Sequence, residues 1–181
     1  MLCLIDEKGW LNSARALPSP NCDDRPDGEA IRLIVIHAIS LPPEQFGGEA
    51  VADLFLNRLD PNGHPYFRDI ANARVSAHFF IRRDGELIQF VSCFQRAWHA
   101  GVSNWKGRER CNDFSLGIEL EGSDNQAFDA SQYRVLNMLL ANLGVSFPNL
   151  EIVGHSDIAP GRKTDPGPFF DWAQIVQASA G

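Results

Sequence analysis

The sequence has little lysine and no cluster of basic residues. Only three of its 16 Lys and Arg residues are lysine, and 23 Asp and Glu residues bring the formal net charge to −7. Nucleic acids and anionic membranes attract proteins through basic patches. We therefore expect neither as a partner. The acidic balance also argues against attraction by charge to an anionic cell-wall polymer.

Long apolar runs and a leader segment are also missing. No run approaches the ~20 apolar residues that span a bilayer. The N-terminal segment MLCLIDEKGWLN is acidic and is interrupted by Gly9, unlike a secretory signal peptide. No C-x-x-C pair occurs, which argues against a cysteine-based zinc or redox site and for free thiols in a reducing compartment. The sequence thus predicts a cytoplasmic protein with four free cysteines: Cys3, Cys22, Cys93 and Cys111.

The length of 181 residues, with 44% hydrophobic and 22% charged residues, suits one domain over residues 1–181 with its own core. The β-branched run at 31–37 predicts a strand buried on both faces, and 115–122 and 150–155 predict two more. Residues 76–91 predict a hairpin that turns at Asp84-Gly85. These segments indicate a central sheet of mixed strand direction.

Three segments have helical patterns. Residues 49–59 place Val51, Leu54, Phe55 and Leu59 on one face, and 170–178 predict a final helix. Residues 129–144 predict a helix capped by Asp129 or Ser131 and closed by Gly144. The buried stripe of this helix is expected to contain Tyr133, Leu136, Leu140 and Leu143. The expected fold class is α+β with α/β-type layering, in which a mixed sheet is flanked by helices.

Two predicted strands each end in a histidine, His37 in IVIH and His155 in IVGH. Functional groups gather where strands give way to loops, so these two imidazoles could lie together. Asp165 follows His155 by ten residues in the stiff loop GHSDIAPGRKTDPG. Two imidazoles and one carboxylate leave a coordination position of Zn²⁺ open for water. A single histidine at a strand end is more often structural, and the spacing alone is not specific.

Glu119 lies in the strand LGIELEG, where Gly117, Glu119 and Glu121 alternate with apolar residues. If that face is solvated, both carboxylates are surface groups. If it faces a cleft, Glu119 could accept a proton from water and pass it to a leaving amine. Lys163, two residues before Asp165, could stabilise an oxyanion, or could be a surface lysine.

The remaining histidines have weaker patterns. His64 and His78 are expected to be structural, the latter in the core or behind the ligands. His99, next to Trp98 in AWHAG, is typical either of an aromatic cleft floor or of a buried packing cluster.

Taken together, the segments resemble the zinc amidases of the peptidoglycan-recognition type, and within them the cytoplasmic 1,6-anhydro-N-acetylmuramoyl-L-alanine amidases. The resemblance covers nearly the whole chain, and the order and spacing of its strings make it specific. They include GWLNSARALPSPNCDDRP, IVIHAISLPP, HPYF, RVSAHFFIRRDGELIQFV, RAWHAGVS, GRERCNDFSLGIELEG and GHSDIAPGRKTDPGPFFDW.

This resemblance implies a zinc hydrolase that cuts the amide between N-acetylmuramic acid and L-alanine during peptidoglycan recycling. It implies a small soluble muropeptide as substrate, a monomer, and an indirect role in β-lactamase induction. It maps the zinc ligands onto His37, His155 and Asp165. It maps the catalytic groups onto Glu119, Lys163 and Tyr66. Substrate contacts are expected from Arg74, Arg110 and Ala159, with Trp98 and His99 as a cleft floor.

One position departs from the family pattern. The family usually has asparagine after the first histidine, where this chain has Ala38. Alanine offers no amide group to a substrate, so peptide binding could be weaker. Two other functions remain open: a muropeptide-binding module without catalysis, and an amidase acting on intact cell wall. Because the third ligand and the base are both present, the sequence favours catalysis over binding alone.

Overall fold

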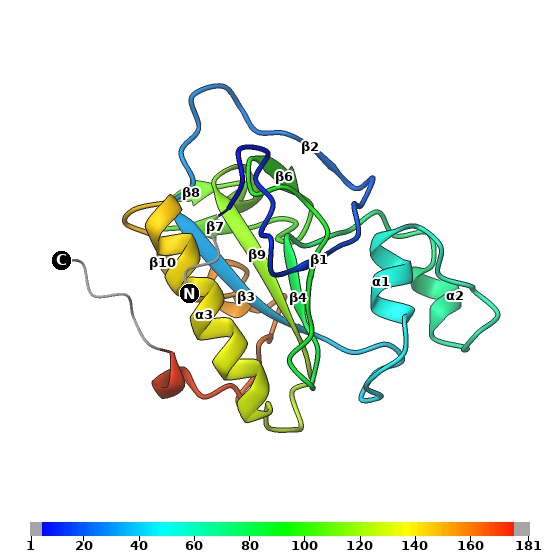
Figure 1. The fold of residues 1–181 in the computed structure, drawn as a ribbon. Helices are drawn as coiled ribbons and strands as arrows, with labels where there is room; N and C mark the ends of the chain where they lie inside the picture. Colours follow the sequence, from blue (N-terminus) through cyan, green and yellow to red (C-terminus); the bar gives the residue numbers. More distant parts are fainter. Residues whose placement is uncertain (1–4, 176–181) are drawn as a thin grey trace.

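The computed structural model describes residues 5–175, and its centre is a six-stranded sheet. The strand order is β1-β5-β4-β9-β3-β10 (Figure 1). The bounds are β1 Arg15–Ala16, β5 Leu87–Gln89, β4 Phe79–Ile81, β9 Ser115–Glu121, β3 Leu33–Ile39 and β10 Glu151–Gly154. Neighbouring strands are parallel except β4 and β5. The predicted mixed sheet is therefore confirmed, and so is the hairpin, with shorter strands than expected.

Parallel pairing aligns the carboxyl ends of β3, β9 and β10. His37 in β3 pairs with Glu119 in β9, and Gly154 at the end of β10 pairs with Ile36. His155 follows directly as the first residue of the short helix α4 (His155–Ile158). Three candidate residues thus reach the same edge of the sheet because of strand register.

One face of the sheet packs against the long helix α3 (Ala130–Ser146), which crosses it in Figure 1. Asp129 and Gln132 form a capping box at its start. Gly144 does not end this helix as predicted, because helical hydrogen bonding continues and Phe147 N–H donates to Leu143 O. The shared core contains Ile34, Ile36, Phe79, Ile81, Leu116, Ile118, Leu120, Tyr133, Leu136, Leu140 and Leu143.

The opposite face carries two smaller apolar clusters. In one, Phe80 and Ile88 of the sheet pack with helix α1 (Ala50–Phe55) and the residues around helix α2 (Phe67–Ile70). In the other, Leu33 and Val35 pack with Cys111, Phe114, Val153 and Ile158. Helix α1 is shorter than the predicted 49–59, and Asn57 beyond it has a φ of 58°. Leu59 is nevertheless buried, as its pattern predicts.

Two small ribbons were not predicted from the sequence. Strand β2 (Cys22–Asp24) pairs with β6 (Gln95–Ala97), and β7 (Asn104–Trp105) pairs with β8 (Arg108–Glu109). A 3₁₀ turn, η1 (Cys111–Asp113), leads into β9. In place of the predicted last helix there is one 3₁₀ turn, η2 (Trp172–Gln174), and residues 176–178 of that prediction lie outside the described residues.

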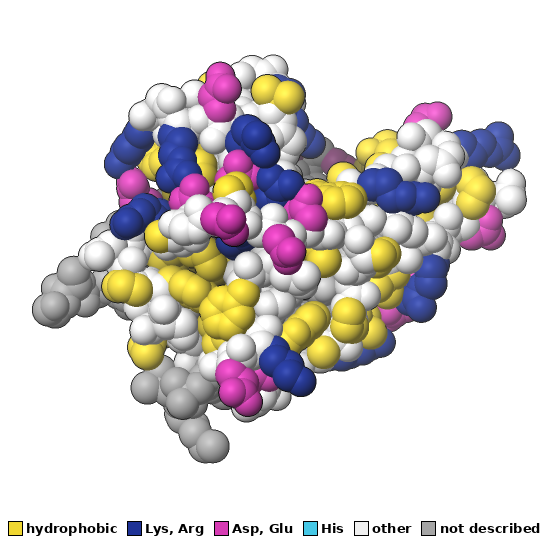
Figure 2. All heavy atoms as spheres, turned by 90° about the horizontal axis from the view of Figure 1, so that it is seen from above, with side chains coloured by type: hydrophobic (Ala, Val, Ile, Leu, Met, Phe, Trp, Pro, Cys, Tyr) yellow, Lys and Arg dark blue, Asp and Glu magenta, His cyan; other side chains and the backbone are white. Residues whose placement is uncertain are grey.

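Charge and thiol placement match the sequence expectations where they are described. Basic and acidic side chains are interspersed on the face shown in Figure 2. Cys22, Cys93 and Cys111 are free thiols, and the fourth predicted free thiol, Cys3, lies outside the described residues. Among the helices within residues 5–175, none has both the length and the apolar character needed to cross a bilayer.

Candidate metal centre and active-site cleft

A cleft of about 470 Å³ opens where β3 and β9 end and the loop after α4 begins. Its lining includes His37, Glu119, His155, Lys163 and Asp165, with Tyr66 and Trp98 on its walls. A larger hollow of about 680 Å³ lies between residues 25–32 and 147–149. That second hollow holds no histidine, so the chemistry-bearing residues converge in the smaller cleft.

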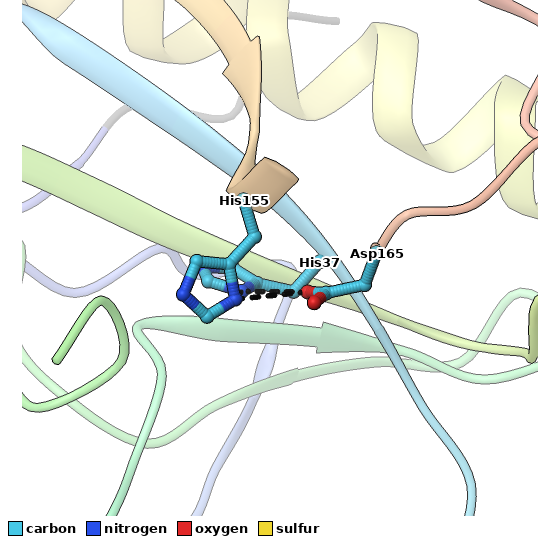
Figure 3. A group of neighbouring side chains, drawn as sticks. All are labelled: His37, His155 and Asp165. Atoms are coloured by element: carbon cyan, nitrogen blue, oxygen red, sulfur yellow. Dashed lines mark hydrogen bonds and ion pairs between the residues drawn. The ribbon is translucent and has the colours of Figure 1, made fainter. Parts of the chain in front are cut away.

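Three side chains from distant parts of the chain point at one another in this cleft (Figure 3). His37 Nδ1 lies 3.0 Å from His155 Nδ1 and 3.1 Å from Asp165 Oδ2. His155 Nδ1 lies 3.0 Å from the same carboxylate oxygen. The three atoms form a nearly equilateral triangle. Ligands bound at ~2.0–2.1 Å to a tetrahedral zinc ion are separated by roughly 3.3 Å, so the triangle fits three corners of such a site within a few tenths of an ångström.

The positions of the ring protons at this triangle also favour a bound cation. His155 Nε2 lies 3.2 Å from the carbonyl oxygen of Ala100, which can only accept a hydrogen bond. The neutral His155 ring therefore carries its proton on Nε2 and presents the lone pair of Nδ1 to Asp165 Oδ2. Two acceptor atoms 3.0 Å apart repel each other unless a positive charge lies between them. The donor set thus fits a metal ion better than a hydrogen-bond network alone.

The electrostatics keep His37 and Asp165 ready to bind a cation. Burial lowers the pKa of His37 to about 4, although Asp165 opposes this shift. Burial alone would raise the pKa of Asp165, but its contacts with His155 and His37 lower that pKa overall. At neutral pH, His37 is therefore neutral and Asp165 is ionised. These are the protonation states that metal ligands require.

The loop that carries Asp165 is fixed by main-chain hydrogen bonds and by one side-chain hydrogen bond. Ser156 N–H donates to Asp165 O at 2.9 Å, and Lys163 N–H donates to Ala159 O at 3.1 Å. Thr164 Oγ1 donates to Asp124 Oδ2 at 2.5 Å. The loop therefore holds its carboxylate beside His155 without relying on the metal.

Glu119 is buried beside the triangle, so the alternative of a solvated strand face is wrong. Its Oε2 is buried and has no hydrogen-bond partner within the described part of the chain. Burial and the charge of Asp165 raise the pKa of Glu119 well above its ordinary value, while Lys163 opposes the shift. A carboxylate with a free oxygen and a raised pKa has the properties of a general base.

Glu121, two residues along, has a different environment. Its Oε1 accepts a hydrogen bond from Gly47 N–H and its Oε2 accepts one from Arg83 N–H at 3.0 Å. The carboxylate thus ties the loop before α1 to the hairpin turn. The alternating pattern in the sequence places Glu119 and Glu121 on the same face of the strand. Only their contacts in the structure show that their roles differ.

Lys163 and Tyr66 both line the cleft as expected. Lys163 is exposed on the loop before Asp165 and is near enough to Glu119 to influence its pKa. Tyr66 is 43% exposed at the start of α2. Both side chains can therefore reach a bound substrate.

The other expected substrate contacts lie at different distances from the cleft. Trp98 lines it and donates its Nε1–H to Asp23 Oδ1 at 3.2 Å. Arg74 is exposed between two lining residues, but neither it, nor Arg110, nor Ala159 is itself part of the lining. Arg110 is exposed and pairs with Asp113, and Ala159 is buried.

His64 and His78 have structural roles, as their patterns predict. His64 Nδ1 accepts a hydrogen bond from Tyr66 N–H at 3.2 Å in a turn. His78 is fully buried, and Nδ1 accepts a hydrogen bond from Gly117 N–H at 3.0 Å. Burial lowers the pKa of His78 to about 3.

Sequence reasoning missed the residues that support this region from behind. Arg25 has no carboxylate within ion-pair distance among the described residues, and its guanidinium donates to the carbonyl oxygens of Asn112, Asp113, Cys93 and Ser115. Burial lowers the pKa of Arg25 to about 10. Asn112 Oδ1 accepts hydrogen bonds from His99 N–H and Ala100 N–H. No local pattern distinguishes these residues, because their partners are backbone atoms far away in sequence.

Comparison with known proteins agrees with this geometry. Residues 27–168 match the family described as N-acetylmuramoyl-L-alanine amidase. The 1,6-anhydro-N-acetylmuramyl-L-alanine amidase AmpD of Escherichia coli K12 is 55% identical over 174 residues, covering 95% of this chain and 95% of that protein. The AmpD of Citrobacter freundii is 56% identical over 174 residues, covering 95% and 92%.

Solved structures agree as well. The crystal structure of a selenomethionine derivative of AmpD superposes with a TM-score of 0.93 at 55% identity, covering 95% of this chain and 97% of that one. The complex of E. coli AmiD with the substrate anhydro-N-acetylmuramic acid-L-Ala-D-γ-Glu-L-Lys superposes at 0.59 with 26% identity, covering 96% and 64%. The resemblance seen in the sequence is thus confirmed, and the chain belongs to the N-acetylmuramoyl-L-alanine amidase family.

Proposed function

We propose that this protein hydrolyses the amide bond between 1,6-anhydro-N-acetylmuramic acid and L-alanine in soluble muropeptides, using zinc held by His37, His155 and Asp165. The observation that carries the proposal is the unpartnered, buried carboxylate oxygen of Glu119 in the same cleft as that triangle. The near full-length relatives that act on the anhydro sugar support this choice of substrate.

The ligand set has the composition of a catalytic zinc site, with three protein ligands and one open position. When bound, zinc would polarise the scissile carbonyl and lower the pKa of a coordinated water. The protein supplies two neutral imidazoles and one carboxylate, so the bound ion would keep a net positive charge. Ala100 O fixes the tautomer of His155 that exposes Nδ1 to the ion.

Glu119 moves the proton in this scheme. Its carboxylate accepts a proton from the attacking water, and its raised pKa allows it to hold that proton during the attack. The same carboxyl group then delivers the proton to the nitrogen of L-alanine as the amide bond breaks. The acid and the alanine amine are the products, so one water is consumed for each bond.

Lys163 and Tyr66 act on the groups that change charge. The ammonium of Lys163 faces the cleft and would stabilise negative charge on the carbonyl oxygen. The exposed hydroxyl of Tyr66 is available to hydrogen-bond the reacting amide or to assist the leaving amine.

The stem peptide extends away from these groups. We assign to Arg74 and Arg110 the recognition of its carboxylates, because guanidinium binds carboxylate through two parallel hydrogen bonds. Since neither arginine lines the cleft, both would contact only the distal part of the peptide. Trp98 would pack against the substrate as part of the wall. The expected contact from Ala159 is not part of this proposal, because the residue is buried, its N–H donates to His155 O, and its carbonyl oxygen accepts from Arg162 N–H and Lys163 N–H.

The setting of the reaction is part of the same proposal. Free thiols at Cys22, Cys93 and Cys111 suit a reducing compartment, and a soluble anhydro-muropeptide is a product of wall turnover. We therefore propose that a monomer acts in cytoplasmic peptidoglycan recycling. Removal of such muropeptides would also lower any signal that they send for β-lactamase induction.

Two other functions make different predictions. A binding module would retain muropeptide without cutting it, and an amidase of intact wall would release peptides from murein. The unpartnered oxygen of Glu119 favours catalysis over binding alone. Incubation with anhydro-muropeptide and with intact murein, followed by mass analysis and zinc measurement on the same sample, separates the three. Cleavage confined to the soluble substrate supports the proposal, and cleavage of murein alone contradicts it.

The catalytic assignment is tested by Glu119→Gln with Glu121→Gln as the matched control on the same strand face. Replacing Glu119 removes the proton acceptor, so kcat should fall by about 10²–10⁴-fold while zinc binding is retained. Glu121→Gln should keep most of the folded enzyme's kcat, because that carboxylate binds backbone amides. A chelator should abolish wild-type activity and zinc should restore it. Near wild-type kcat in Glu119→Gln would show that the base lies elsewhere.

A further inference from the structure

The segment Trp98–Ala100 contacts the outer nitrogen of both imidazoles in the triangle. His99 Nδ1 lies 2.9 Å from His37 Nε2, and the carbonyl oxygen of Ala100 lies 3.2 Å from His155 Nε2. Two histidines from separate elements, His37 in β3 and His155 in α4, are thus supported by neighbouring residues of one segment. Asn112 fixes this segment by accepting hydrogen bonds from the N–H groups of His99 and Ala100.

The hydrogen bonds of His99 have one consistent direction. If His37 presents the lone pair of Nδ1 to a metal, its proton must be on Nε2, which then donates to His99 Nδ1. His99 accepts at Nδ1 and therefore carries its own proton on Nε2. That Nε2 lies 3.2 Å from Ser115 Oγ, which can accept the hydrogen bond. With a metal bound at His37 Nδ1, each ring of the chain His37–His99–Ser115 has a single tautomer, which the Ser115 hydroxyl can accommodate as an acceptor.

Gly117 makes the space that His99 fills. A Cβ atom at position 117 would lie 2.5 Å from His99 Cγ and 2.7 Å from His99 Nδ1. No side chain larger than hydrogen fits there while the ring stays in place. The gap beside Glu119 in the strand is therefore occupied by an imidazole, and both nitrogens of that imidazole are engaged by protein atoms.

We propose that His99 is a positioning residue that, with Ser115, holds His37 in the tautomer and orientation required for metal binding, and that it is not primarily a substrate contact. This proposal rests on the metal centre described under the proposed function and deepens it. Removal of an outer partner of a ligating histidine typically weakens metal binding by about 10–100-fold. Zinc affinity is therefore the readout that separates positioning from substrate contact.

The first test measures zinc affinity of the full chain by competition with a chromophoric chelator at fixed pH. His99→Phe keeps a planar ring but has no acceptor for His37 Nε2–H, so the dissociation constant for zinc should rise about 10–100-fold. His99→Gln restores an acceptor oxygen and should recover part of that loss. Zinc affinity of His99→Phe within about twofold of wild type would overturn the proposal, because outer partners contribute more than that.

A second pair of variants tests the hydrogen-bond chain His37–His99–Ser115 without changing His99. Gly117→Ala should displace the ring and weaken zinc binding. Gly122→Ala is the matched control, because its Cβ would lie 2.2 Å from Phe128 in the core shared with α3. Both variants should lose stability, but only Gly117→Ala should lose zinc affinity. Equal zinc affinities in the two variants would contradict the proposed positioning of His37 by His99.

If the His99 variants fail to fold, two other measurements test the proposal. They are the zinc affinity of Ser115→Ala and nitrogen NMR of the histidine rings in the wild-type protein. With zinc added, His37 should carry its proton on Nε2 and bind the metal through Nδ1, and His99 should be protonated on Nε2. The opposite tautomer at His99 would overturn the proposal. A wild-type chain that binds no zinc would overturn the metal centre itself, whereas intact zinc binding in His99→Phe would remove only this inference.

Discussion

The two faces of the central sheet have different roles, although the same strands form both. Toward α3, the side chains of β3, β4 and β9 are apolar and form one continuous core. On the other face, two smaller apolar clusters stand apart, and between them lie His37, Glu119 and the ring of His99. The first face stabilises the fold by burying apolar area, while the second buries ionisable groups that cost stability unless they are paired. Substitutions on the two faces should therefore separate activity from stability.

The largest effect on activity is expected from Asp165→Ala. The change removes the only carboxylate of the triangle and leaves two imidazoles, so kcat/KM should fall by at least about 10²–10³-fold, the scale of losing one group that stabilises charge in the transition state. The fold should persist, because the loop is held through the main chain of Asp165. Activity on anhydro-muropeptide and zinc content measure the first effect, and thermal unfolding measures the second.

Asp171→Ala is the matched control for that change. Asp171 is exposed, lies outside the cleft lining and accepts a hydrogen bond from Ala173 N–H. Its removal should leave kcat/KM and zinc content unchanged. If Asp165→Ala kept its zinc and its activity, the assignment of the reaction to this triangle and this face of the sheet would be wrong.

The sequence predicts the two faces unequally well. Alternation in β9 and the β-branched run in β3 reveal the strands. The predicted strand ends at His37 and His155 bring the two histidines together correctly, although β3 continues to Ile39 and His155 begins α4. These signals work because period and strand direction are local properties. The support from Arg25, Asn112 and Ser115 could not be predicted, because it consists of contacts between side chains and remote backbone or ring atoms.

Element ends and small ribbons escaped prediction for a related reason. Gly144 is a favourable helix terminator by itself, yet α3 continues to Ser146 because Leu143 is fully buried and Phe147 packs against the same core. The short strands β2 and β6 have no alternating pattern. Their pairing depends on tertiary neighbours such as Arg96, which bridges Asp23 and Asp113.

On the α3 face, Leu136→Ala should show the reverse of the Asp165 result. Leu136 is fully buried in the core between α3 and the sheet, so truncation should cost about 2–5 kcal/mol of unfolding free energy. The kcat of the folded protein should stay at the wild-type value, because the cleft lies on the other face. Met138→Ala, at a partly exposed position of the same helix, should change stability by no more than about 0.5 kcal/mol. Urea unfolding and activity assays test both. A loss of kcat in folded Leu136→Ala would show that the faces are coupled.

The last expected effect is a change in stability that is specific to the site face: Glu119→Gln should stabilise the metal-free protein. The folded-state pKa of Glu119 is raised, mainly by burial, so folding is penalised wherever the unfolded carboxyl would be ionised. The penalty is absent below the unfolded pKa of about 4.3 and grows as the pH rises towards the folded pKa. The gain from Gln should therefore be absent at low pH and increase as the pH rises towards neutrality.

Glu121→Gln gives the opposite expectation on the same strand face. Both oxygens of Glu121 accept hydrogen bonds from backbone N–H groups, and the amide nitrogen of glutamine cannot accept one. That variant should lose about 1–3 kcal/mol, because a part-buried hydrogen bond from a backbone N–H to a charged carboxylate is lost. Thermal unfolding of the two metal-free variants across pH therefore distinguishes a carboxylate kept for chemistry from one kept for structure. If both variants were destabilised alike at neutral pH, ionisation of the buried Glu119 carboxyl would not be destabilising the folded protein as predicted.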